Sequence, residues 1–122
     1  MERVFVYGTL KAKYRGEGFG EWKFVGETST SLPYSLYDLG PFPGVRKDHL
    51  STNGVIGELY EVPSLEPLDF YEGYPTLFDR SEIMTERGVA WMYTLKSDAV
   101  RDVDLIPSGQ WPREEKGRER VI

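Results

Sequence analysis

The stretch Val4-Phe5-Val6-Tyr7-Gly8-Thr9-Leu10 near the start of the chain is the most informative part of the sequence. Its short, continuous apolar run predicts a buried strand, and the glycine that follows predicts a turn. Successive main-chain N–H groups at such a turn can point into one concavity and bind an anion or a polarised carbonyl group. The alternative is that Gly8 merely ends a strand, and the residues Tyr7, Gly8, Thr9 and Leu10 leave both interpretations open.

Short runs rich in Val, Phe, Tyr and Thr follow along the chain between glycines and prolines, and they predict further strands. With the opening run, the predicted strands span residues 3–7, 22–32, 34–39, 55–62, 77–86 and 89–95. Gly40-Pro41-Phe42-Pro43-Gly44 predicts a rigid turn, and Glu86-Arg87-Gly88 predicts a hairpin turn. We therefore predict an α+β fold: a small mixed, mostly antiparallel β-barrel with one or two flanking helices.

One segment, residues 64–73, has firm helical signals. Ser64 is suited to cap the helix, Pro67 is tolerated because it falls in the first turn, and Gly73 is suited to end it. A second, shorter helical turn is weakly indicated within residues 11–17.

Glu72 is the candidate catalytic residue. Leu65, Leu68 and Glu72 are spaced to share one helix face, so the two leucines place Glu72 on the side of the core. Partial burial raises the pKa of a carboxyl group, and the negative end of the helix dipole acts in the same direction, with Asp69 as a possible modulator. Such a glutamate is a candidate general base. The alternative is a glutamate that reaches solvent or pairs with Arg80, and spacing alone favours that alternative.

Composition narrows the chemistry. The 122 residues carry a net charge of −5, which argues against nucleic acid as the main partner, and no segment approaches the ~18 apolar residues of a membrane span. There is no cysteine, and His49 is the only histidine, so a thiol nucleophile and a multi-histidine metal site are excluded. We expect residues 1–111 to form one domain and residues 112–122 a charged tail. We also expect no metal, no cofactor, no membrane association and a cytoplasmic location.

Six stretches in order resemble the γ-glutamylcyclotransferase-like superfamily, in its AIG2-like branch. They are Val4-Phe5-Val6-Tyr7-Gly8-Thr9-Leu10-Lys11, Gly40-Pro41-Phe42-Pro43-Gly44, Gly57-Glu58-Leu59-Tyr60-Glu61-Val62, Leu68-Asp69-Phe70-Tyr71-Glu72-Gly73-Tyr74, Ala90-Trp91-Met92-Tyr93 and Ser108-Gly109-Gln110-Trp111. Together they cover about residues 3 to 111. The resemblance implies a small closed or nearly closed mixed β-barrel with flanking helices.

The resemblance also implies an activity: release of 5-oxoproline from γ-glutamyl compounds. It assigns backbone binding of the glutamyl group to Tyr7, Gly8, Thr9 and Leu10, and the essential glutamate to Glu72. The asparagine–histidine pair that branch members often carry shortly after the opening turn is absent from residues 13–17.

The leading hypothesis is an enzyme in which the α-amine of a γ-glutamyl compound attacks its own γ-carbonyl, with Glu72 as general acid and base. Because the substrate carries its own nucleophile, the reaction needs neither serine nor cysteine. Tyr74, Phe78 and Tyr93 are possible walls of the pocket. The alternatives are a non-catalytic module that binds a small anionic metabolite, and a structural or partner-binding barrel. Glu72 favours the enzyme, while the oligomeric state is not predicted.

Overall fold

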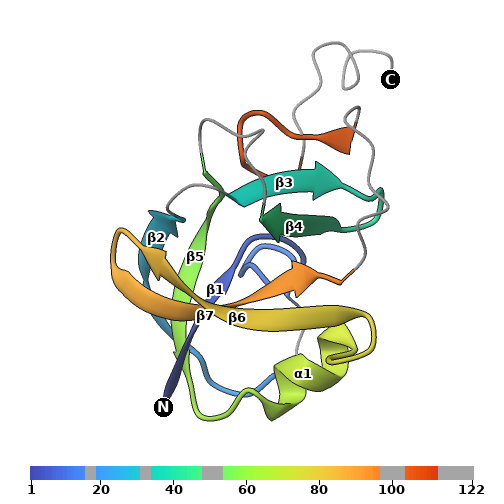
Figure 1. Cartoon of the computed structure of the whole chain (residues 1–122). Helices are drawn as coiled ribbons and strands as arrows, with labels where there is room; N and C mark the ends of the chain where they lie inside the picture. Colours follow the sequence, from blue (N-terminus) through green and yellow to red (C-terminus); the bar gives the residue numbers. More distant parts are fainter. Residues whose placement is uncertain (16–18, 31–33, 48–53, 97–103, 113–122) are drawn as a thin grey trace.

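The computed structural model describes residues 1–15, 19–30, 34–47, 54–96 and 104–112. His49 and all of the charged tail except Pro112 lie outside these ranges, so the predicted tail stays a prediction. The elements within the described ranges are β1 Glu2–Val6, β2 Lys23–Ser29, β3 Tyr34–Asp38, β4 Pro43–Lys47, β5 Ile56–Val62, α1 Glu66–Glu72, β6 Phe78–Thr85 and β7 Gly88–Leu95 (Figure 1).

The main sheet has five strands in the order β2-β5-β1-β7-β6, and β3 and β4 form a separate two-stranded sheet. All pairings are antiparallel except that between β1 and β7, which confirms the predicted mixed, mostly antiparallel α+β fold. The predicted barrel needs correction, because the sheet does not close. Its edge strands, β2 and β6, form no paired ladder within the described residues, and an isolated bridge links Thr30, just after β2, to Thr85 of β6.

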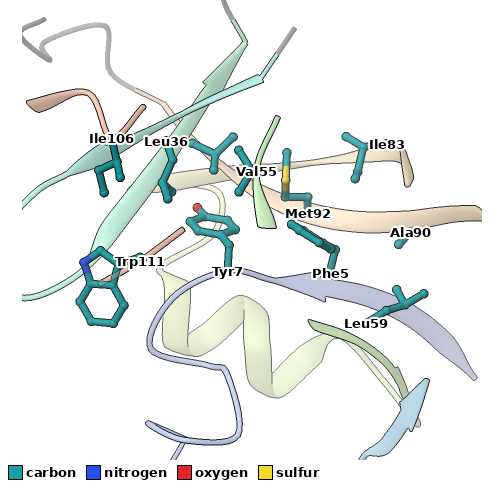
Figure 2. Packing of buried hydrophobic residues seen from close by; sticks show 11 residues of the cluster. Phe5, Tyr7, Leu36, Val55, Leu59, Ile83, Ala90, Met92, Ile106 and Trp111 are labelled. Carbon is teal, nitrogen blue, oxygen red and sulfur yellow. The ribbon is translucent and has the colours of Figure 1, made fainter. Parts of the chain in front are cut away.

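β1 lies at the centre of the sheet, and alternate side chains enter two separate cores. Phe5 and Tyr7 point into the core beneath the β3–β4 hairpin, where Figure 2 shows them beside Leu36 and Val55. Val4 and Val6 point to the opposite side, into the core that contains Leu65 and Leu68 of the helix segment. A strand covered on both faces is apolar at successive positions, which explains the unbroken run in the sequence.

The turn predicted at residues 40–44 is shorter than expected, because Pro43 and Gly44 begin β4. Proline is accepted as the first residue of a strand, where it need not donate to the ladder. Gly44 packs so closely on β7 that a Cβ atom would lie 2.5 Å from Cγ of Leu95. In the described part of residues 11–17, the chain forms the single short turn predicted there, with the main-chain N–H of Arg15 donating to the oxygen of Lys11.

Helix α1 begins at Glu66, slightly later than predicted, and the Ser64 hydroxyl accepts its main-chain N–H at 3.1 Å. It ends as predicted at Gly73, whose φ of 71° is the left-handed conformation that favours glycine. Within the described residues, no helix has both the length and the apolar character needed to cross a membrane.

Candidate functional site

A cavity of about 370 Å³ lies where the end of β1, the end of α1 and the loop between β3 and β4 meet. Its lining comes from residues 5–10, 41–43, 71–72, 77–78 and 93. The structure therefore brings together Tyr7, Gly8, Thr9, Leu10, Glu72, Phe78 and Tyr93, and it leaves Tyr74 out of the lining. Segments far apart in the sequence thus converge on one enclosure that contains the turn and the carboxyl group.

Glu72 is the acidic residue of this lining. Burial raises the pKa of Glu72 to about 7, because the cavity wall keeps water from the ionised carboxylate. Arg80, the cation considered as a partner for Glu72, instead pairs with Asp69, with 2.9 Å between Nε and Oδ1. Because its pKa lies near neutral pH, Glu72 can both accept and donate a proton under physiological conditions.

The turn at Gly8–Leu10 faces the same cavity. The carbonyl oxygen of Gly8 accepts the N–H of Lys11 at 3.0 Å, whereas the N–H groups of Gly8, Thr9 and Leu10 donate to no acceptor within the described residues. Gly8 is required by close packing, because a Cβ atom there would lie 2.5 Å from Cγ of Pro43. The turn therefore offers unpaired donors at a place where the main chain can approach a ligand closely.

Tyr7 holds the site together through its side chain. Its hydroxyl donates to the main-chain oxygen of Tyr93 at 2.8 Å, which joins the end of β1 to β7. Burial, together with the negative charge of Glu72, raises the pKa of Tyr7 well above its ordinary value. The phenol therefore stays protonated and serves as an anchor, so the proton chemistry available in the cavity centres on Glu72.

A chain of polar contacts begins at Tyr93 in the cavity lining and continues to Asp69 and Arg80, which lie outside the lining. The Tyr93 hydroxyl donates to Oδ1 of Asp69 at 2.5 Å, and the same oxygen contacts Arg80. The Arg80 guanidinium lies over two rings, 4.6 Å from the centroid of Tyr74 and 4.8 Å from that of Trp91. The Tyr74 ring therefore packs against Arg80 and does not line the cavity. The prediction of Tyr74 as a possible pocket wall needs correction.

Sequence reasoning missed the outer rim of the cavity. Phe42 and Leu77 line it while remaining 39% and 67% exposed, and Tyr71 is held there by a 2.9 Å hydrogen bond between its hydroxyl and that of Thr9. Leu77 also packs over the helix end, where a Cβ atom on Gly73 would lie 2.9 Å from its Cδ1. An apolar residue in a loop carries little signal by itself, whereas Tyr71 could have been considered because it precedes Glu72.

The residues described do not bring three potential metal ligands of the Asp, Glu, His or Cys types together. The expectation of a reaction without metal or cofactor stays a prediction. What the cavity offers chemically is a set of main-chain donors and a carboxyl group of near-neutral pKa.

Comparison with known proteins identifies a family for the chain. The sequence model of the family described as gamma-glutamyl cyclotransferase, AIG2-like, matches residues 4–113. A Vibrio cholerae protein provisionally named a gamma-glutamylcyclotransferase is 36% identical over 109 residues, covering 88% of this chain and 93% of that protein. The gamma-glutamylcyclotransferase family protein YtfP of Escherichia coli K12 is 34% identical over 116 residues, covering 89% of this chain and 95% of its own.

A solved structure of an AIG2-like protein has a similar fold. The crystal structure of an AIG2-like protein from Mus musculus superposes with a TM-score of 0.74 at 25% identity, covering 94% of this chain and 90% of the mouse chain. The match to the family model spans nearly all of the described fold, including the turn and the glutamate in the cavity. The chain belongs to the AIG2-like gamma-glutamyl cyclotransferase family.

Proposed function

We propose that this protein is a γ-glutamylcyclotransferase-like enzyme that converts a γ-glutamyl compound into 5-oxoproline and a free amine. The observation that carries the proposal is that Glu72, whose pKa is raised to about 7, shares one cavity with the N–H groups of the turn, which have no acceptor among the described residues. Family membership supports the proposal, because related proteins bear the name of this activity.

The substrate enters with its α-nitrogen as an ammonium group. Glu72 accepts a proton from it, and the resulting amine attacks the γ-carbonyl carbon to form a five-membered ring. Glu72 returns this first proton to the departing nitrogen as the C–N bond to it breaks. Glu72 then takes the second proton from the ring nitrogen and passes it to the released amine, which leaves as an ammonium. In total, two protons pass from the α-nitrogen to the departing nitrogen, so the reaction is balanced without an external co-reactant.

The turn at Gly8–Leu10 stabilises negative charge on the substrate. Main-chain N–H groups at Gly8–Leu10 are suited to bind the α-carboxylate of the glutamyl group or the oxyanion that develops on the γ-carbonyl. They hold one rotamer of the flexible glutamyl chain, which brings the amine against the carbonyl. Phe78 and Tyr93 would enclose the methylene groups of that chain.

The proposal is tested with a panel of γ-glutamyl dipeptides, glutathione and γ-glutamyl-lysine, with 5-oxoproline measured as the product. We expect turnover of at least one compound by the parent protein, and a loss of about 100-fold or more in kcat for Glu72→Gln. Binding without turnover by a well-folded parent protein would instead identify a non-catalytic small-metabolite module.

A further inference from the structure

The proton of the Tyr93 hydroxyl has a fixed direction. An ionised carboxylate can only accept, so the 2.5 Å contact between the hydroxyl and Oδ1 of Asp69 requires that Tyr93 is the donor. A phenol has one proton, and once it is donated the oxygen can take part in further hydrogen bonds only as an acceptor. The Tyr93 oxygen is therefore an acceptor toward any ligand that reaches it.

Asp69 is held in place to receive this proton. The same oxygen of Asp69 lies 2.9 Å from Nε of Arg80, and both side chains are largely shielded, at 21% exposed for Arg80 and 23% for Asp69. The Arg80 guanidinium in turn lies over the rings of Tyr74 and Trp91. These two ring contacts and the ion pair hold Arg80 in place, and Arg80 in turn holds the carboxylate that accepts the Tyr93 proton.

Tyr93 itself stays neutral and fixed. Burial, the hydrogen bond to Asp69 and the charge of Glu72 all raise its pKa above the ordinary value, so the phenol is not a base. Its main-chain oxygen accepts the Tyr7 hydroxyl at 2.8 Å, which ties its backbone to the end of β1. The side chain lies in the same cavity lining as Glu72.

Hydrogen-bond donors and acceptors therefore come from different parts of the cavity lining. The turn at Gly8–Leu10 offers N–H donors that have no acceptor among the described residues. The acceptors are the Glu72 carboxylate and the phenol of Tyr93, a lining residue close enough to Glu72 for that charge to raise its pKa. An α-amino acid group has the complementary pattern, with an accepting carboxylate and a donating ammonium on the same carbon. We propose that the Tyr93 hydroxyl oxygen accepts a hydrogen bond from the α-ammonium of the substrate, with Asp69 and Arg80 as positioning residues that direct its proton away from the cavity.

This inference rests on the proposed function, since it assumes that an α-amino group enters the cavity. It goes further by assigning selectivity: the site distinguishes a ligand with an α-ammonium from the same ligand without one. If Tyr93 had only a structural role, its substitution would change the affinity for both ligands equally, because a loss of packing affects every ligand of the cavity.

The test uses two ligands, γ-glutamyl ethylamide and N-ethylglutaramate, which is the same molecule with hydrogen in place of the α-amino group. Their Kd values are measured by calorimetry on Glu72→Gln, which prevents turnover, and on that variant combined with Tyr93→Phe. A hydrogen bond to a charged group corresponds to roughly 10- to 100-fold in affinity. We expect Tyr93→Phe to weaken binding of γ-glutamyl ethylamide by this factor and to change binding of N-ethylglutaramate less than about threefold.

Two further variants complete the design. Tyr34→Phe removes a phenol oxygen from β3, outside the cavity lining, and should change neither Kd. Asp69→Asn retains the shape but no longer fixes the phenol proton, and should also weaken binding of the ammonium ligand selectively. If Tyr93→Phe fails to fold, Asp69→Asn provides the same comparison.

Equal weakening of both ligands, or no change for either, would overturn the assignment of Tyr93 while leaving the proposed reaction intact. Failure of both ligands to bind, together with no 5-oxoproline from any γ-glutamyl compound, would overturn the proposed function and this inference with it. A selective loss of ammonium-ligand binding in Tyr93→Phe, with no turnover by the parent, would support Tyr93 as a binding residue and contradict the enzyme assignment alone.

Discussion

Removing the charge of Glu72 should stabilise the protein in a manner that depends on pH. In the unfolded chain this carboxyl has its ordinary pKa of 4.5, whereas burial raises the pKa to about 7 in the folded protein. The folded state therefore binds the proton more tightly, and the ionised side chain reduces the free energy of unfolding. A tenfold difference in proton affinity corresponds to about 1.4 kcal/mol, so the full cost is about 3 kcal/mol.

The pH range follows from these values. Below pH 4.5 the carboxyl is protonated in both states and costs nothing, between pH 4.5 and about 7 the cost grows, and above that range it is complete. Glu72→Gln keeps the shape and removes the charge. We expect its free energy of unfolding to match that of the parent near pH 4.5 and to exceed it by about 1 to 3 kcal/mol at pH 8.

Urea unfolding of the parent and the variant at several pH values between 4.5 and 8.5 measures this difference. Glu82→Gln is the control, because it removes the same charge from an exposed position on β6 and should give a small difference at every pH. A Glu72→Gln protein that is less stable than the parent at pH 8, or a difference that does not grow with pH, would refute the idea that Glu72 is a desolvated and unpaired carboxyl.

Three other outcomes are expected. The kcat/KM of the parent should rise as the pH increases through about 7, because Glu72 must lose its proton to act as a base; a profile flat from pH 5 to 9 would contradict this role. Gly8→Ala should reduce the free energy of unfolding by about 1 to 3 kcal/mol, as measured in urea, since its Cβ would meet Pro43 at 2.5 Å. Arg80→Ala should reduce it by about 1 to 2 kcal/mol, because Asp69 loses its ion-pair partner in a shielded position; an unchanged midpoint would show that the pair contributes nothing.

The sequence was sufficient to predict the elements that have strong local signals. A strand buried on both faces is apolar at successive positions, so β1 and its glycine turn were recognisable. The helix was also predicted, because Pro67 and Gly73 have distinct conformational preferences at its two ends. The shared spacing of Leu65, Leu68 and Glu72 then placed the glutamate on the correct face.

Features set by long-range packing could not be predicted. β4 was missed because Pro43 and Gly44 indicate a turn locally, whereas the paired hairpin and the contact with Leu95 make them part of a strand. The barrel was expected from the short strands between glycines and prolines and from the family resemblance, and nothing in the sequence shows that β2 and β6 form no paired ladder within the described residues.

The same limit applies within the site. Asp69 and Glu72 both lie on α1, and Arg80 pairs with Asp69 while its guanidinium lies over the rings of Tyr74 and Trp91. Those rings come from different elements, so only the folded structure brings them together. That arrangement removes Tyr74 from the cavity wall, and it leaves Glu72 unpaired among the described residues.

The central claim is that the α-amine of the substrate, and not water, attacks the γ-carbonyl with Glu72 as acid and base. The most direct measurement follows a turned-over γ-glutamyl compound in water enriched in ¹⁸O, with mass spectrometry of both products. The account predicts 5-oxoproline free of ¹⁸O in an amount equal to the released amine, and a loss of both products in Glu72→Gln. Glutamate carrying ¹⁸O in place of 5-oxoproline would show that the protein is a hydrolase and would contradict the account.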